Sequence, residues 1–209
     1  MKVAVIAANG KQGQLIVKEA LGRGLDVTAI VRHENKSEAK KVIQKDILNL
    51  TAADLAPFDV VVDAFGAYAP DLLPLHTKTS QHLCDLLSGT SKRLLIVGGA
   101  GSLYMNKEHT LQLVQTPDFP AEYRPLAQAQ TDELAQLRKR NDVNWTFVSP
   151  AAVFDPEGAR TGKYTLAGEE FTLSPQGDSV ISYADYAIGF VDEIVKGAHL
   201  KQRISLVRA

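Results

Sequence analysis

The chain has 209 residues, of which 45% are hydrophobic and 22% are charged, and its formal net charge at pH 7 is -1. These values exclude a largely disordered chain, and the lack of a basic surplus argues against nucleic-acid binding. No stretch approaches the roughly 20 apolar residues of a membrane-spanning helix. The single cysteine, Cys84, rules out an internal disulfide and is typical of a reducing compartment. We therefore expect a soluble cytoplasmic domain without a nucleic-acid or membrane partner.

Short apolar runs rich in valine and isoleucine alternate with amphipathic segments. Because these runs are continuously apolar, they predict strands covered on both faces, and alternation with helices predicts a parallel sheet. The expected strands span residues 3–8, 27–32, 40–46, 60–65, 93–99 and 145–150, and the expected helices span residues 12–23, 72–87 and 126–140. The fold class is therefore predicted to be α/β, a doubly wound, mostly parallel sheet of the Rossmann type.

The sequence changes character after Pro150, where glycine, proline and charged residues become frequent. Strand-like pieces around Tyr164 and Phe171 predict a small hairpin over the site, followed by a helix over residues 183–196 and a last strand over 203–207. Residues 102–125 have no clear period. We expect one domain over 1–209, with a dinucleotide-binding core in 1–150 and substrate-side loops, the last helix and the last strand in 151–209.

The first strand runs into a glycine-containing turn, Ala7-Ala8-Asn9-Gly10-Lys11-Gln12-Gly13, and then into a helix. Backbone N–H groups and the helix dipole favour an anion at such a helix start, and glycines allow a pyrophosphate and the strand to come close. Alanine replaces the first glycine of the usual pattern, and it would be strained at a positive φ. A plain strand–helix turn is the alternative to dinucleotide binding. The candidate cofactor contacts are Ala8, Asn9, Gly10, Lys11, Gln12 and Gly13.

The second strand ends at Arg32, where an NAD-binding site would carry an acidic residue. A guanidinium suits a 2′-phosphate, so Arg32 favours NADP, with NAD as the alternative cofactor. Lys36 is placed to assist. A solvated basic turn is the other interpretation.

Together these features resemble the atypical short-chain dehydrogenase/reductase group that includes the NmrA-like regulators and the NAD(P)H-binding NADH-flavin reductases. The resemblance covers nearly the whole chain, and its most specific stretches are the opening turn, VVVDAFGA, RLLIVGGAGSLY, NWTFVSPAAVFDPEGARTGKY and ISYADYA. It implies adenine contacts at Asp46 and Ile47 and dinucleotide contacts at Ala64, Phe65 and Gly66. It also implies nicotinamide contacts at Ser149, Pro150, Ala151 and Val153.

The loop after the fifth predicted strand supplies further candidates. Gly98 and Gly99 are expected to contact the cofactor, and Ser102 is the main catalytic candidate because short-chain reductases orient a carbonyl with a serine near this point. Tyr104 is the second catalytic candidate. A hydroxyl here could donate to a developing oxyanion, and a glycine-rich loop with a capping serine is the alternative.

The Tyr-x-x-x-Lys pair of typical short-chain dehydrogenases is missing. Tyr123 is followed four residues later by Ala127, and Gln130 stands where many relatives carry lysine or histidine. Without a neighbouring lysine, tyrosine is a poor acid–base catalyst at neutral pH. Two functions remain: an NAD(P)H-dependent reductase of a small planar acceptor such as a flavin or quinone, or a non-catalytic NAD(P)-binding redox sensor of the NmrA-like type.

The remaining features predict structure more than chemistry. Ser182 is expected to cap the last helix, with Asp185 three residues on. The five histidines lack metal-binding spacing, so no metal site is expected. The sequence leaves a monomer or a homodimer open.

Overall fold

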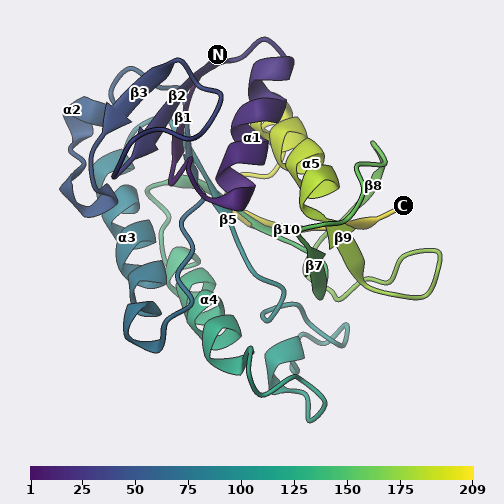
Figure 1. The fold of residues 1–209 in the computed structure, drawn as a ribbon. Helices are drawn as coiled ribbons and strands as arrows, with labels where there is room; N and C mark the ends of the chain where they lie inside the picture. Colours follow the sequence, from purple (N-terminus) through teal and green to yellow (C-terminus); the bar gives the residue numbers. More distant parts are fainter.

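The computed structural model describes residues 1–209, and an eight-stranded sheet forms its centre (Figure 1). The strand order is β3-β2-β1-β4-β5-β6-β10-β8, and β8 alone runs antiparallel to its neighbour. The strands are β1 (Lys2–Ile6), β2 (Asp26–Val31), β3 (Lys41–Gln44), β4 (Val60–Asp63), β5 (Arg93–Val97), β6 (Asn144–Ser149), β8 (Tyr164–Ala167) and β10 (Gln202–Arg208). The predicted Rossmann-type sheet is confirmed.

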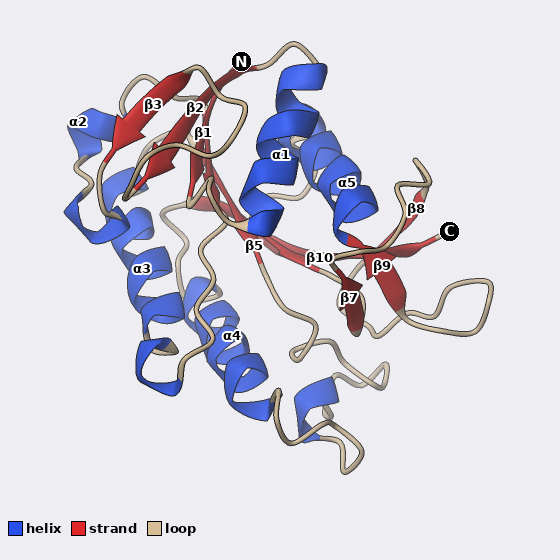
Figure 2. Ribbon diagram, in the orientation of Figure 1, coloured by secondary structure: helices blue, strands red, loops and turns tan.

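Helices cover both faces of the sheet (Figure 2). One face carries α1 (Lys11–Gly22) and α5 (Tyr183–Lys196), which lie side by side, and the other carries α3 (Leu75–Leu87) and α4 (Arg124–Leu137). A one-turn helix, α2 (Ala52–Leu55), and three short 3-10 helices, η1 (Ile47–Asn49), η2 (Pro70–Leu72) and η3 (Leu113–Gln115), complete the helical elements.

Two hydrophobic cores lie on opposite faces of the sheet because side chains alternate along each strand. Val5 of β1 packs in the core beneath α1 and α5, whereas its neighbour Ile6 packs in the core beneath α3 and α4. Cys84 is fully buried in this second core, and burial raises the pKa of its thiol to about 12. Cys84 is therefore a small core residue.

The hairpin predicted after Pro150 is wrong. Tyr164–Ala167 does form a strand, β8, but it pairs with β10 at the edge of the main sheet, and Phe171 lies outside any strand. The second sheet is instead a parallel pair of β7 (Val153–Asp155) and β9 (Val180–Ser182). β8 pairs with the backbone N–H and C=O groups that β10 would otherwise leave free at the edge of the sheet. Local sequence patterns do not reveal this pairing because the two strands are far apart in the chain.

Strand order reverses between β1 and β4, because β2 and β3 lie on one side of β1 and the later strands on the other. In open α/β sheets, ligands bind beyond the carboxyl ends of the strands at such a switch point. The turn after β1 and the exit of β4 both lie there. None of the helices combines the length and the apolar character that a membrane crossing requires.

The last turn of α5 is tied to the sheet by Arg93 of β5. Its guanidinium donates to the Glu193 carbonyl at 3.1 Å and to the Ile194 carbonyl, beside the left-handed Gly197 that ends the helix. Unpaired carbonyls at a helix end are stabilised by such a cation.

We expect Arg93→Met to lower the free energy of unfolding by about 1–3 kcal/mol, because two buried carbonyls lose a charged donor. Chemical denaturation measures this. Lys139→Met, which removes an exposed cation, serves as the control. Equal stability of the two variants would contradict a capping role for Arg93.

Candidate functional site

The turn after β1 adopts the backbone conformation for which the glycine pattern usually supplies a glycine. Ala7 lies in the left-handed region with a φ of +56°, and the Gly10 N–H donates to the Ala7 carbonyl at 2.9 Å. Alanine is strained in this region by roughly 1–2 kcal/mol. The expectation that this position needs a positive φ is therefore confirmed, and the chain tolerates Ala7 there.

Gly13 allows α1 to lie directly against the turn. A Cβ at Gly13 would stand 2.6 Å from the Ala7 carbonyl oxygen and 3.0 Å from the Ala8 Cα. Gly10 is less crowded, since its Cβ would meet the same oxygen at 3.3 Å. The close approach of helix and strand thus depends mainly on Gly13.

The first turn of α1 offers uncompensated donors to a ligand. Gly10, the N-cap residue, has no side chain to accept from the helix, and the first turn contains no acidic residue. Such a helix start favours an anion such as a pyrophosphate. Gln12 is 7% exposed, and its Oε1 has no hydrogen-bond partner. A buried acceptor without a donor is costly unless a ligand supplies one, so both features fit a bound dinucleotide.

Asn9 connects this turn to the loop after β2. Its side chain donates to the Glu34 carbonyl at 2.8 Å and accepts from the Lys36 N–H at 2.7 Å. Arg32 lies at the end of β2, exposed to solvent, on the loop that Asn9 holds. The two predicted stretches, the turn and the basic loop, are therefore neighbours.

The exit of β4 carries a buried carboxyl group. Asp63 is 2% exposed, and its Oδ1 accepts from the Phe65 N–H at 3.0 Å. Burial raises the pKa of Asp63 to about 6, with the Phe65 hydrogen bond opposing it. Ala64 and Phe65 are half-buried and Gly66 is exposed, so this predicted stretch borders solvent at the carboxyl edge of the sheet.

The exit of β6 combines a buried and an exposed part. Ser149, Pro150 and Ala151 are buried, whereas Val153 is 55% exposed at the start of β7. The Val153 N–H donates to the Ser179 carbonyl at 2.9 Å, which joins β7 to β9. Of this predicted group, Val153 presents its side chain to solvent.

The glycines after β5 face protein. A Cβ at Gly98 would stand 2.2 Å from the Phe147 ring, and one at Gly99 would stand 2.1 Å from Gln130 Oε1 of α4. The absence of side chains here lets the chain pack against β6 and α4. Gln130 of α4 thus contacts this loop.

Ser102 is 2% exposed, and its hydroxyl lies 3.4 Å from Nη1 of Arg203. The same nitrogen lies 3.4 Å from the Ser149 hydroxyl, so one guanidinium brings the two predicted serines together. The Arg203 side chain is fully buried and forms an ion pair with Glu169 at 2.5 Å. A contact between Ser102 and a bound acceptor would require this loop to move.

Tyr104 lies apart from Ser102. Its hydroxyl accepts from Arg138 at 3.2 Å, and its ring stacks on His109 with centroids 4.4 Å apart. Arg138 shares Glu169 with Arg203. Sequence reasoning missed this network, because its members come from four separate parts of the chain.

Two further predictions concern local structure. Asp46 caps η1 by accepting from the Leu48 N–H at 2.9 Å, and Ile47 is buried behind it, so both stabilise this turn. Ser182 accepts from the Asp185 N–H at 3.0 Å, which confirms it as the N-cap of α5. Asp185 in turn accepts from the Thr161 N–H at 2.9 Å.

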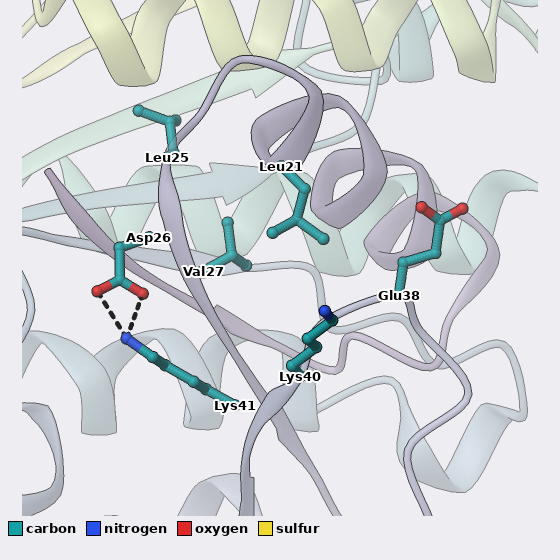
Figure 3. A pocket seen from close by; sticks show the side chains of 7 residues that line it. All are labelled: Leu21, Leu25, Asp26, Val27, Glu38, Lys40 and Lys41. Carbon is teal, nitrogen blue, oxygen red and sulfur yellow. Dashed lines mark hydrogen bonds and ion pairs between the residues drawn. The ribbon is translucent and has the colours of Figure 1, made fainter.

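A hollow of about 310 Å³ lies elsewhere, at the amino ends of β2 and β3 (Figure 3). Asp26 and Lys41 form an ion pair across it at 2.7 Å. The other lining residues are Leu21, Leu25, Val27, Glu38 and Lys40. Because the glycine turn lies at the opposite edge of the sheet, this hollow is separate from the candidate site.

The strand order and the glycine turn define a dinucleotide-binding protein of the Rossmann type. Residues 7–193 match the model of the NAD(P)H-binding family. The chain belongs to this family, and its cofactor is a nicotinamide dinucleotide.

Several relatives match nearly the whole chain. A Streptococcus pneumoniae protein described as a putative NADH-flavin reductase is 59% identical, with a TM-score of 0.98 and full coverage of both chains. The uncharacterized protein YwnB of Bacillus subtilis is 46% identical over 99% of this chain and 98% of its own. A putative epimerase from Bacteroides thetaiotaomicron is 32% identical, with a TM-score of 0.86 and coverage of 99% and 96%. The predicted resemblance to the NADH-flavin reductase group is confirmed.

We expect Gly13→Ala to destabilise the protein by about 1–3 kcal/mol, because the new methyl group overlaps backbone atoms. It should also weaken NADPH binding, since the start of α1 must shift. Thermal unfolding measures the loss of stability, and calorimetric titration measures the change in NADPH affinity. Gly22→Ala in the same helix is the control, because its Cβ would meet nothing within 4 Å. Unchanged NADPH affinity in Gly13→Ala would contradict binding at this turn.

Asp63 predicts a pH dependence of stability. A carboxyl whose folded pKa is about 6, against an ordinary value of 3.8, stabilises the fold below pH 3.8 and loses that contribution as pH rises through 6. Asp63→Asn should therefore be more stable than the parent at pH 7.5, by up to about 3 kcal/mol, and nearly equal to it at about pH 4. Denaturation curves at the two pH values test this. A constant difference between the variants at both would contradict the burial effect.

Proposed function

We propose that the protein is an NAD(P)H-dependent oxidoreductase that transfers hydride to a small planar acceptor, a flavin or a quinone. The observation that carries the proposal is the start of α1. The first N–H groups of this helix have no side-chain cap, and Gly13 lets the helix begin close to the end of β1. The Gln12 Oε1 atom, which has no hydrogen-bond partner, lies in the same turn at the switch point of the sheet. The relative described as a putative NADH-flavin reductase supports the choice of acceptor.

The polar groups near the site favour an acceptor that needs no acid from the protein. Gln130 packs against Gly99, and Ser102 is buried against Arg203. Four residues after Tyr123, where a Tyr-x-x-x-Lys pair would have its lysine, the chain has Ala127. Flavins and quinones accept a hydride and take one proton from solvent. A carbonyl being reduced to an alcohol depends more strongly on a placed proton donor.

The chain's own residues then act by binding and orientation. A bound reduced nicotinamide supplies the hydride. The first turn of α1 binds the pyrophosphate, and the exits of β4 and β6 border the nicotinamide end. Fixing two reactants in a reactive geometry lowers the entropic part of the barrier.

The proposed cofactor preference is for NADP. Arg32 stands exposed at the end of β2, on a loop that Asn9 ties to the glycine turn. An acidic residue for the ribose hydroxyls is absent from this position. A planar guanidinium binds a phosphate with two donors.

The test is the oxidation of NADPH or NADH by the purified protein, followed at the reduced nicotinamide absorbance, with FMN, FAD or a small quinone added in turn. Acceptor-dependent oxidation is expected. Tight NADPH binding with no turnover against any acceptor would contradict the reductase and support the redox sensor.

We expect Arg32→Ala to weaken NADPH binding about 10-fold or more, because a charge-assisted contact to phosphate is worth roughly 1.5–3 kcal/mol. NADH binding should change little. Calorimetric titration of both cofactors measures the difference, and Lys40→Ala, which removes an exposed cation at the amino edge of the sheet, is the control. Equal losses for NADPH and NADH would contradict the 2′-phosphate contact.

A further inference from the structure

Three aromatic side chains from separate parts of the chain meet beside the candidate site. Tyr68 lies in the loop after β4, Phe154 in β7, and Tyr183 at the start of α5. The ring centroids of Phe154 and Tyr183 are 4.0 Å apart, and those of Phe154 and Tyr186 are 4.8 Å apart. Burial raises the pKa of Tyr183, and the neighbouring Tyr68 raises it further.

Two contacts place this aromatic cluster, Tyr68, Phe154 and Tyr183, against the proposed cofactor site. Gln12 of the glycine turn donates from Nε2 to the Tyr183 carbonyl at 3.3 Å. A Cβ at Gly66 would stand 3.8 Å from the Tyr68 hydroxyl. The cluster therefore extends from the turn that would bind the pyrophosphate to the β4 exit that would border the nicotinamide.

Tyr68 is the exposed member of the cluster, at 74%, whereas Phe154 and Tyr183 are half-buried and Phe154 packs against the core beneath α1 and α5. By contrast, one face of the Tyr104 ring is already stacked on His109, and Arg138 lies 5.9 Å from its centroid. Tyr68 thus offers a ring to a ligand, whereas Tyr104 is engaged with the protein.

We propose that Tyr68, Phe154 and Tyr183 form the binding surface for the isoalloxazine ring of a flavin acceptor. This inference rests on the proposed function, because it takes the nicotinamide to lie at the exits of β4 and β6. Aromatic faces bind planar rings by stacking, and tyrosine hydroxyls bind ring carbonyls. Tyr183 stays protonated at neutral pH, so it donates a hydrogen bond and no proton.

The reaction at this surface balances without a further reactant. The C–H bond of the reduced nicotinamide breaks, and its hydrogen and electron pair pass to a ring nitrogen of the flavin. A proton from solvent neutralises the reduced ring. The cofactor is oxidised by two electrons and the flavin is reduced by two.

The experiment titrates FMN into the protein saturated with NADP⁺, where no turnover occurs, and follows the quenching of FMN fluorescence. Tyr68→Ala should weaken FMN binding roughly 5- to 150-fold, the equivalent of the 1–3 kcal/mol measured for a stacked aromatic ring. Tyr68→Phe, which keeps the ring, should stay close to the parent. Leu200→Ala, which shortens an exposed apolar side chain before β10, should leave FMN binding unchanged.

NADPH binding, measured by calorimetry in the same variants, separates the two proposals. Unchanged NADPH affinity with weakened FMN binding in Tyr68→Ala supports the aromatic surface. FMN binding in Tyr68→Ala equal to the parent, or no FMN binding by the parent, overturns it while cofactor binding stands. If the parent does not bind NADPH, the proposed function fails and the aromatic surface fails with it.

Discussion

The contact between Gly13 and the Ala7 carbonyl is the constraint on which the candidate site depends. Because no Cβ intervenes, α1 begins directly beyond the end of β1, and its free N–H groups lie at the switch point of the sheet. The left-handed backbone conformation of Ala7 turns the chain sharply, so that α1 can begin there. Asn9, which holds the basic loop, and Gln12, which donates to the Tyr183 carbonyl, both belong to this turn.

A second constraint is the buried guanidinium of Arg203. An unpaired charge inside a protein is strongly destabilising, so Glu169 and the Ser102 carbonyl must meet it. This requirement ties the loop after β5 to the segment after β8. As a consequence, Ser102 is held within the loop after β5 and is only 2% exposed.

The sequence predicted the sheet, its helices and the glycine turn because these depend on local patterns: apolar runs, helical spacing and glycine at a close approach. It also predicted the Ser182 cap, which needs only neighbours in the chain. It missed the pairing of β8 with β10, the Arg203 network and the convergence of Tyr68, Phe154 and Tyr183. Those contacts join residues far apart in sequence, and no local signal marks them. No local pattern marked Asp63 either, since its raised pKa follows from the burial of the end of β4 in the folded protein.

The central claim is that a nicotinamide dinucleotide binds across the start of α1 and the exits of β4 and β6. Amide hydrogen exchange with and without NADPH tests it most directly, because backbone N–H groups are the proposed ligands of the pyrophosphate. We expect added protection in residues 9–13, 64–67 and 149–153, with the amino edge of the sheet unchanged. Protection confined to the hollow near Asp26 and Lys41, or none at the glycine turn, would contradict the claim.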